Sequence, residues 1–425
     1  MKILYLVRGI RKKSFFNNID ELYSRGNNTG NMVFETAVEK YISYDSNEID
    51  YMLIHDFRLN LTDEQANDIN NKYDIIIVAF ANCIAEYPLS VEEGYITTFL
   101  NSIKKIKIPF NIIGMGAQGS LNYEQINLSI KAKDTLKEFI DNVLRTKGKI
   151  GLRGYYTGSI FSDLGYTEDK DYTVTGCPSI YYEGRDLKIE NEKISKDLFN
   201  PIFNGNEFLH TDILSKYSNS LFIDQDWLYE FILSPRSFLI KHPNFINSKS
   251  SLIAYIDNRI KIWGDYMQWK NAIKSYNFSI GTRIHGNILP ILVGMPSHLI
   301  AIDSRTRELA EYNNIPYTKI TEISDLNNID LYDIYCKTDY TKFNENYLNN
   351  FDKFKNFFDS IVPNNLLNVK SDFDKKYYNG IDCNIKLKNR HYIRKLINSN
   401  IYEKNEEQRL AKIKKVTFID KLLNI

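Results

Sequence analysis

Residues 277–316 read NFSIGTRIHGNILPILVGMPSHLIAIDSRTRELAEYNNIP, and this stretch decides the fold. Its apolar run at residues 278–280 predicts a short buried strand. Residues 287–293 predict a helix, because the Gly and Pro of GMP follow it as helix-stopping residues. Residues 298–303 predict a second strand, and residues 304–313 predict a helix that begins at an N-capping Asp or Ser. This alternation of strand and helix indicates an α/β fold.

A cation and a titratable imidazole lie where the first of these strands ends. Arg283 and His285 follow the strand, and Gly286 opens the helix. Ligands of open α/β sheets bind at the carboxyl edge of the strands, and helix N-termini attract anions. The position therefore suits an anion-binding site. An arginine paired with a carboxylate and a histidine packed into the core would fit the residues alone equally well.

The N-terminal half of the chain repeats the alternation. Its apolar runs predict strands at residues 2–7, 50–55, 73–80, 110–113, 149–152 and 172–175, and helices at residues 32–44, 99–106, 130–144 and 156–164. Arg153 ends one of these strands just ahead of a predicted helix, which is the setting of Arg283 as well. It is either a second anion-binding group or a surface arginine.

Two glycine-rich segments are candidate ligand contacts. GNNTGNM at residues 26–32 lets the backbone approach a ligand closely, so Asn27 and Asn31 could contact one. It lacks the lysine of a phosphate-binding P-loop, and an ordinary loop fits equally well. GMGAQG at residues 114–119 has the GxGxxG spacing, but no acidic residue ends a strand about 20 residues later. We interpret it as a cleft loop with Gln118 available for hydrogen bonds.

Composition excludes several classes of protein. The chain has 425 residues, enough for two domains, and its formal net charge of +1 gives no basis for general nucleic-acid binding. The start of the chain lacks the apolar segment of a signal peptide, and no apolar run approaches the roughly 20 residues that cross a bilayer. These features predict a cytoplasmic protein. The four cysteines form no CxxC pair, and Cys177 fits a small filler at a tight turn better than a reactive thiol.

The order of predicted elements divides the chain into four parts. We expect an N-terminal Rossmann-like lobe, an interdomain crossover, a C-terminal Rossmann-like lobe and a tail, at residues 1–182, 183–220, 221–362 and 363–425. The other strands expected in the C-terminal lobe are residues 221–224, 252–256 and 317–320. Its other helices are expected at residues 225–233, 257–275, 323–327 and 343–361, and the last is expected to return to the first lobe.

The tail differs from the rest of the chain in charge. Residues 366–425 hold 14 Lys and Arg against 7 Asp and Glu. Residues 385–397 and 409–423 predict amphipathic helices with basic faces. Such helices suit peripheral contact with the anionic lipid of the inner membrane face, or with a lipid-pyrophosphate-linked glycan. A solvated helical appendage or an oligomer contact is the alternative.

Taken together, these motifs resemble the polysaccharide pyruvyl transferase family. The most specific part is GTRIHG at residues 281–286 with the GMP and DSR that follow, and the likeness takes in WKNAIKSYNFSIGTR at residues 269–283. It is looser in GNNTGNM, GMGAQG, GLRGYYTGSIFSDL at residues 151–164, and TGCPS at residues 175–179. The likeness does not cover the tail. Many relatives have an Asp-Pro turn where this chain has GCPS, so the resemblance supplies no catalytic carboxylate there.

The resemblance implies two Rossmann-like lobes of the GT-B type around a central cleft, with the acceptor on the first lobe and the donor on the second. It implies transfer of the pyruvyl group of phosphoenolpyruvate onto two hydroxyls of one sugar in a cell-surface polysaccharide or its precursor, giving a cyclic ketal. His285 and Arg283 would be catalytic. The donor would contact Arg153, Arg283, Ile284, Gly286 and Arg305, and the acceptor would contact Asn27, Asn31 and Gln118.

The chemistry implied by this resemblance needs few parts. Phosphoenolpyruvate carries up to three negative charges, so the guanidinium groups of Arg153 and Arg283 suit its phosphate and carboxylate. Its methylene carbon must be protonated, and an imidazole with a pKa near neutrality, that of His285, suits this step. Arg305 either completes the donor pocket or caps the neighbouring helix. The scheme calls for no metal and no bound cofactor.

Two other functions fit the same features. A GT-B-type glycosyltransferase would use a nucleotide-activated sugar and would need a carboxylate for the ribose in the second lobe, where the sequence offers no convincing candidate. A non-catalytic subunit of a glycan-assembly complex would use the cleft only to hold anions.

Overall fold

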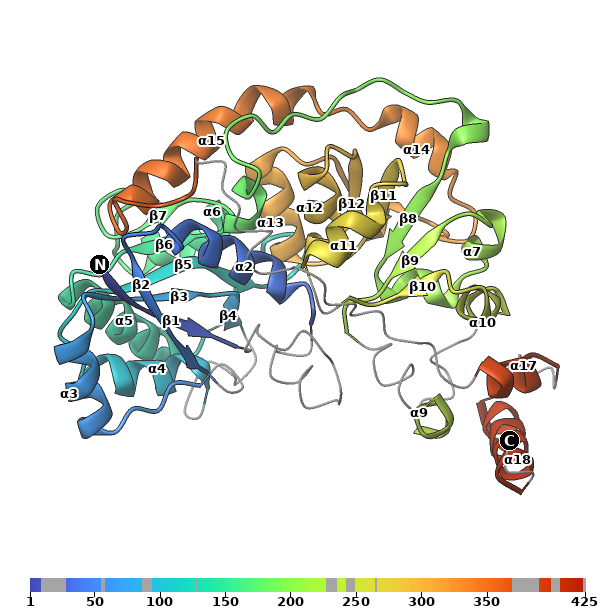
Figure 1. Cartoon of the computed structure of the whole chain (residues 1–425), viewed down its shortest axis with the longest axis horizontal. Helices are drawn as coiled ribbons and strands as arrows, with labels where there is room; N and C mark the ends of the chain where they lie inside the picture. Colours follow the sequence, from blue (N-terminus) through green and yellow to red (C-terminus); the bar gives the residue numbers. More distant parts are fainter. Residues whose placement is uncertain are drawn as a thin grey trace.

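The chain forms two α/β lobes, each built on a parallel sheet (Figure 1). The computed structural model describes residues 1–8, 28–54, 58–85, 94–124, 126, 128–226, 235–241, 249–263, 266–368, 390–398 and 406–422. Within these residues the first sheet has seven strands and the second has six. This is the two-lobed Rossmann-like arrangement of the GT-B type that the sequence predicts.

The first lobe has the strand order β2-β1-β3-β5-β6-β7, with β4 paired to β5. All of these pairings are parallel, so the carboxyl ends of the strands share one edge. The strands are β1 Lys2–Val7, β2 Glu48–Leu53, β3 Ile75–Ala79, β4 Asn82–Ala85, β5 Phe110–Gln118, β6 Ile150–Leu152 and β7 Thr173–Val174. The helices are α2 Asn31–Ile42, α3 Asp63–Lys72, α4 Tyr95–Ile103, α5 Ile130–Arg145 and α6 Tyr155–Asp163.

The first sheet is buried on both faces, as its continuous apolar runs predict. In β1, Ile3, Tyr5 and Val7 pack on the face that α2 covers. Leu4 and Leu6 pack on the opposite face, together with residues of α3, α4 and α5. This alternation is the period of two that places successive side chains of a strand on opposite faces.

The second lobe has the strand order β10-β9-β8-β11-β12-β13, again with parallel pairings. The strands are β8 Pro201–Asn204, β9 Leu221–Ile223, β10 Ile260–Lys261, β11 Phe278–Gly281, β12 Ser297–Ala301 and β13 Tyr317–Lys319. The helices are α7 Ile213–Lys216, α9 Pro235–Lys241, α10 Lys249–Ile256, α11 Tyr266–Ile273, α12 Ile284–Leu292, α13 Ser304–Asn313 and α14 Leu331–Lys337. Short 3-10 turns include η3 Pro178–Tyr181, just after β7.

Helix α15, Thr341–Asp359, follows the second lobe in sequence but packs on the first. Figure 1 shows it in orange across the top of the molecule, above β7. Phe354 of α15 lies against Tyr41 of α2 and against Tyr181 of η3, with ring centroids 5.8 and 4.7 Å apart. Lys353 also forms an ion pair of 2.7 Å with Glu168 of the first lobe. The expected return of this helix to the first lobe is confirmed.

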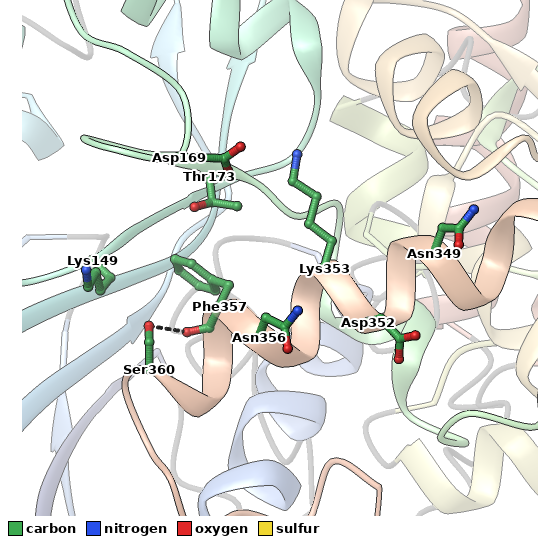
Figure 2. Close-up of a pocket in the computed structure, with 9 residues that line it drawn as sticks. All are labelled: Lys149, Asp169, Thr173, Asn349, Asp352, Lys353, Asn356, Phe357 and Ser360. Atoms are coloured by element: carbon green, nitrogen blue, oxygen red, sulfur yellow. Dashed lines mark hydrogen bonds between the residues drawn. The ribbon is translucent and has the colours of Figure 1, made fainter.

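A hollow of about 670 Å³ lies between α15 and the first sheet (Figure 2). Lys149 and Thr173, which border the starts of β6 and β7, form one wall, and Asn349 and Lys353 of α15 belong to the other. These strand starts form the amino edge of the sheet. The candidate site residues lie at the opposite, carboxyl edge of the sheet. The hollow is therefore separate from them.

The structure differs from the predicted elements in several places. Residues 323–327 form bends and turns where a helix was expected, and most of the expected helix at residues 225–233 lies outside the described residues. The second sheet begins at β8, inside residues 183–220, which were expected to be only a crossover. The expected strand at residues 252–256 is part of α10, and the expected helix at residues 257–275 is divided into β10 and the shorter α11. A short apolar run such as LIAYI cannot be assigned by periodicity alone, and here α7 and α17 contact the helix it forms.

The segment GMGAQG is strand rather than loop. β5 continues through Gly114 and ends at Gln118. Gly114 has φ of +73°, which a residue with a side chain rarely adopts, and the register of the β5–β6 pairing shifts beside it. Glycine thus permits a bulge within the strand, and the interpretation of this segment as a cleft loop is wrong.

The tail contributes α17 Arg390–Asn398 and α18 Glu406–Leu422, drawn in red beside the second lobe in Figure 1. Tyr392, Ile393 and Leu396 of α17 are buried, and α17 contacts α10. The exposed positions of the two helices include Arg394, Lys414 and Lys415. The apolar side of α17 is therefore covered by the protein itself. Among the described residues, no helix is both long and apolar enough to cross a membrane.

Candidate active site

The candidate residues lie where the carboxyl edges of the two sheets approach each other. Arg8 follows β1 and Arg153 follows β6 in the first lobe. Arg283 follows β11 in the second lobe, and Arg305 lies in the first turn of α13, just after β12. The same strand-exit logic that singled out Arg153 and Arg283 in the sequence applies to Arg8, which sequence reasoning missed.

A buried network of amides fixes the backbone between β11 and α12. Asn204, at the end of β8, accepts a hydrogen bond from the backbone N–H of Arg283 at 2.9 Å. Asn287 donates to the carbonyls of Gly281 and Arg283 at 3.0 and 2.9 Å. At Gly286 a Cβ would lie 2.6 Å from Cγ of Asn204, so only glycine allows this approach. The start of α12 is thus held against the centre of the second sheet.

Helix α12 places His285 at the boundary between the lobes. The side chain is buried, and its ring lies 5.4 Å from that of Phe34 on α2, measured between centroids. Its Nε2 lies 3.6 Å from Sγ of Cys177, which follows β7 in the first lobe. Burial, and then the charges of Arg153 and Arg8, hold the pKa of His285 well below its ordinary value. The imidazole is therefore neutral at neutral pH, and the expected pKa near neutrality is wrong for the protein alone.

Arg153 is buried, and its hydrogen bonds go to backbone carbonyls. Its Nε donates to the carbonyl of Gly114 at 2.8 Å, and its guanidinium lies 5.2 Å from the ring centroid of Phe34. Among the described residues, no carboxylate lies within ion-pair distance of Arg153. Burial and the neighbouring charges of Arg8 and Arg305 lower its pKa, because each disfavours the charged form.

Arg8 completes what we call the cation cluster, which is Arg8, Phe34, Arg153, Cys177 and His285. The Nε of Arg8 forms a buried ion pair of 2.6 Å with Glu35 of α2, and its guanidinium lies 4.9 Å from the centroid of Phe34. Removal of one partner from a buried ion pair costs roughly 3–5 kcal/mol. Glu35 therefore anchors Arg8 to the wall of the cluster.

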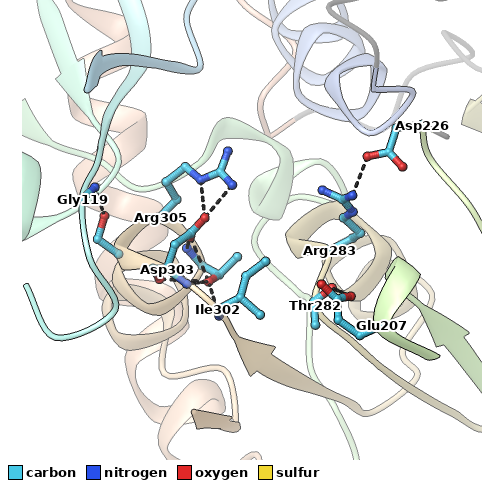
Figure 3. A network of polar contacts seen from close by, with 10 residues as sticks. Gly119, Glu207, Asp226, Thr282, Arg283, Ile302, Asp303 and Arg305 are labelled. Atoms are coloured by element: carbon cyan, nitrogen blue, oxygen red, sulfur yellow. Dashed lines mark hydrogen bonds and ion pairs between the residues drawn. The ribbon is translucent and has the colours of Figure 1, made fainter. Parts of the chain in front are cut away.

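The remaining two arginines are matched with carboxylates (Figure 3). Arg283 forms an ion pair of 2.5 Å with Asp226, which follows β9. Arg305 forms one of 2.5 Å with Asp303, which also N-caps α13. Both guanidinium groups remain partly exposed.

The predicted acceptor residues are placed only in part. Asn27 lies outside the described residues. Asn31 is the first residue of α2, and Gln118 is exposed at the end of β5. Ile284 begins α12 directly after Arg283 and is partly buried.

The loop before α2 crosses to the second lobe. Thr29 donates its backbone N–H to the carbonyl of Gln225 at 2.7 Å. A Cβ at Gly30 would lie 2.2 Å from Oε1 of Gln225 and 3.2 Å from Cβ of His285. Gln225 is fully buried, and its Nε2 has no hydrogen-bond partner in the described part of the chain. Sequence reasoning missed this residue, because it follows a short strand and belongs to no motif.

The family model of polysaccharide pyruvyl transferases matches residues 28–304. This span contains Arg153, Arg283 and His285 and ends at the start of α13. No curated protein sequence matches the chain.

Several solved structures have a similar fold. UDP-GlcNAc 2-epimerase from Neisseria meningitidis, bound to UDP-GlcNAc, is 11% identical with a TM-score of 0.42, and the match covers 86% of this chain and 100% of that chain. Anabaena Alr3699/HepE in complex with UDP-glucose is 10% identical with a TM-score of 0.43, covering 85% and 100%. S. aureus MnaA with UDP is 11% identical with a TM-score of 0.37, covering 75% and 84%. Likeness this distant carries no argument about function.

Proposed function

This chain belongs to the polysaccharide pyruvyl transferase family, and from that premise we propose that it transfers the pyruvyl group of phosphoenolpyruvate to two hydroxyls of one sugar, forming a cyclic ketal. The acceptor is a sugar of a cell-surface polysaccharide or of its precursor. One observation supports the proposal most. Of the four arginines at the meeting edges of the sheets, Arg153 alone has no carboxylate partner within the described residues, and it shares a buried cluster with His285 of the other lobe.

The donor is a small trianion, and the cation cluster suits its charge. A buried guanidinium that has only carbonyl partners gains much from a phosphate or carboxylate, because the surrounding medium screens the attraction weakly. Arg153 therefore binds the donor first. Arg283 and Arg305, each beside its own carboxylate, supply further contacts when their ion pairs open. The first turn of α12, at Ile284 and Gly286, adds backbone N–H groups.

The reaction proceeds by addition and then loss of phosphate. The first sugar hydroxyl adds to C2 of phosphoenolpyruvate while C3 takes a proton, which gives a tetrahedral ketal phosphate. Inorganic phosphate leaves, and the second hydroxyl attacks C2 and closes the ring. Two protons leave the hydroxyls, of which one balances the proton gained by C3 and the other goes to the departing phosphate.

His285 delivers the proton to C3 only after the donor binds. The charges of Arg153 and Arg8 help to keep the imidazole neutral in the protein alone. The negative charges of the donor act in the opposite direction and raise the pKa of His285. Donor binding thus charges the acid that the next step uses. The Sγ of Cys177, 3.6 Å from Nε2, helps to orient the ring.

The acceptor enters from the side of the first lobe. The exposed Gln118 at the end of β5, Asn31 at the start of α2, and Asn27 are the groups that contact it. The basic residues Arg394, Lys414 and Lys415 of the tail bring the enzyme to an anionic surface at the cytoplasmic face of the membrane or to a pyrophosphate-linked acceptor. With the apolar side of α17 covered, this attraction is electrostatic and weakens with salt.

The test is an assay of the purified chain with phosphoenolpyruvate and a panel of galactose, mannose and N-acetylhexosamine acceptors. We expect phosphate release coupled to an acceptor mass gain of one pyruvyl group. Transfer from a nucleotide sugar alone would instead establish a glycosyltransferase. Binding of phosphoenolpyruvate without turnover on any acceptor would favour a glycan-assembly subunit.

A further inference from the structure

Helix α13 of the second lobe is joined to the first lobe along what we call the α13 seam, which comprises its contacts from Ser304 to Tyr312. Ser304 accepts a hydrogen bond from the backbone N–H of Gly119 at 2.7 Å, and Tyr312 donates to the carbonyl of Val174 at 3.0 Å. Between these two ends lies a buried carboxyl group, that of Glu308.

Glu308 reaches across the seam to the first turn of α6. Its Oε1 accepts the backbone N–H of Thr157 at 2.6 Å, and its Oε2 accepts the hydroxyl of the same residue at 3.0 Å. The cap residue of α6, Gly154, has no side chain to satisfy this N–H. A residue of the opposite lobe therefore supplies the cap.

The contact also fixes the turn that carries Arg153. A Cβ at Gly154 would lie 2.3 Å from Cγ of Glu308, so the side chain of Glu308 occupies the space beside this turn. The hydroxyl of Thr157 in turn accepts the backbone N–H of Ala117 at 3.0 Å. These bonds connect Glu308 of α13, through Thr157 at the start of α6, to Ala117 of β5. Arg153 also donates a hydrogen bond to β5, at the carbonyl of Gly114.

We infer that Glu308 is a positioning residue for the donor site, because it holds the Arg153–Gly154 turn of the first lobe in register with His285 of the second. The inference rests on the proposed function for its activity measurement, although the cross-lobe cap itself does not. Glu308 acts through Arg153 and makes no contact with the donor.

The surroundings of Glu308 make the cap sensitive to its charge. Burial raises the pKa of Glu308 to about 7, while the bonds from Thr157 and the charge of Arg153 act in the opposite direction. Arg153 faces it from the β6–α6 turn, Tyr123 from the segment after β5, and Glu311 from its own helix. A raised pKa means that this group favours the fold at low pH and that its contribution falls as pH rises through about 7.

Three variants test the inference. Glu308→Gln keeps an acceptor for the N–H of Thr157, so we expect the Michaelis constant for phosphoenolpyruvate to stay within about threefold of wild type. Glu308→Ala loses the cap, and we expect that constant to rise roughly ten- to a hundred-fold, because small misplacements of a binding group are costly. Thr157→Val keeps the N–H and should fall between them. Recovery by Gln of what Ala loses is the result that supports positioning.

Glu311→Gln is the matched control. Glu311 lies one turn further along α13 and accepts a hydrogen bond across the seam from Tyr123 at 2.6 Å, without touching α6. We expect Glu311→Gln to leave the donor's Michaelis constant within about twofold. Equal effects of Glu308→Ala and Glu311→Gln, or no effect of Glu308→Ala, would overturn the inference.

A second measurement separates this inference from the proposed function. Melting temperature is followed from pH 5.5 to pH 8 for wild type and Glu308→Gln. We expect the wild type to lose stability relative to Glu308→Gln as pH rises, because only the wild type carries the titrating carboxyl group. If no acceptor turns over but this difference appears, the cap stands and the proposed function fails. Parallel curves would instead show that the titration of Glu308 does not affect the stability of the fold, which would contradict a charged cap.

Discussion

Two of the places where the lobes meet differ in how their polar groups are paired. Along the α13 seam, the buried groups of Ser304, Glu308 and Tyr312 each have a hydrogen-bond partner in the other lobe. In the cation cluster, Arg153 is buried among carbonyls and an aromatic ring, and the imidazole of His285 lies beside a thiol and the same ring. The seam is satisfied by the protein itself, whereas the cluster carries positive charge that an anionic ligand would balance.

From this difference we propose that the α13 seam holds the lobes together and that the cation cluster binds the donor. A satisfied interface fixes geometry, because opening it would expose paired polar groups. An unsatisfied buried cation lowers stability and gains more when a ligand arrives. Substitutions in the two interfaces test that contrast.

The largest effect is expected from His285→Ala. Loss of a positioned acid typically costs 10²–10⁴-fold in rate, so ketal formation should fall by that factor while the fold and donor binding are retained. Phosphate release measures the rate of ketal formation, and a donor titration measures donor binding. His298→Gln is the control, since His298 is a partly buried histidine of the second lobe whose ring nitrogens bond Thr318 and Thr338. An active His285→Ala variant would end the assignment.

The effect of substituting each arginine on the donor's Michaelis constant should depend on whether a carboxylate already pairs with that arginine. Arg153→Lys loses the forked donor, and we expect the Michaelis constant for phosphoenolpyruvate to rise about a hundred-fold. Arg283→Lys retains its charge beside Asp226, so a rise of about ten-fold is expected. Arg185→Lys, in an exposed ion pair with Asp352, should change nothing. A larger effect at Arg283 than at Arg153 would reverse the contrast.

Donor binding should be coupled to proton uptake at His285. Its pKa lies well below the ordinary value in the protein alone and rises when the trianion binds, so the bound state takes up protons and donor affinity falls as pH rises. Calorimetric titration in two buffers that differ in ionisation enthalpy measures the uptake. The same titration of His285→Asn subtracts the donor's own ionisation, and equal uptake in the two proteins would contradict the coupling.

The smallest effect on activity is expected in the α13 seam at Ser304. Ser304→Ala leaves the partly buried N–H of Gly119 without its side-chain acceptor, so the free energy of unfolding should fall by about 1 kcal/mol. Activity should stay within about twofold, because Gly119 follows β5 and does not carry Arg153. Urea unfolding and the phosphate assay together check this, and a large loss of activity with unchanged stability would be inconsistent with it.

Much of the fold follows from local sequence. β1 matches the predicted residues 2–7, and α13 matches residues 304–313, capped by Asp303, one of the two expected capping residues. These elements have strong local signals, a continuous apolar run in one and a capping residue in the other. β8 was missed because it is only four residues long, although it pairs with both β9 and β11.

The sequence indicated which residues could form the candidate site, but it did not indicate which of the arginines are paired with carboxylates. Strand-exit position identified Arg153, Arg283 and His285, because parallel strands bring their carboxyl ends to one edge. It could not show that Asp226 pairs with Arg283, because the two residues follow different strands that are far apart in sequence. Glu308 gave no signal either, since its partner Thr157 lies 151 residues away.

Helix α15 packs into a hydrophobic core that both lobes share. Its aromatic side chains Phe351, Phe354 and Phe358 belong to the same core as Tyr41 of the first lobe and Trp269 of the second. The segment that finishes the first lobe is therefore synthesised only after the whole second lobe. Exchange of lobes between relatives by a single crossover would separate α15 from the surface it covers, so we expect such hybrid chains to be less stable than either parent.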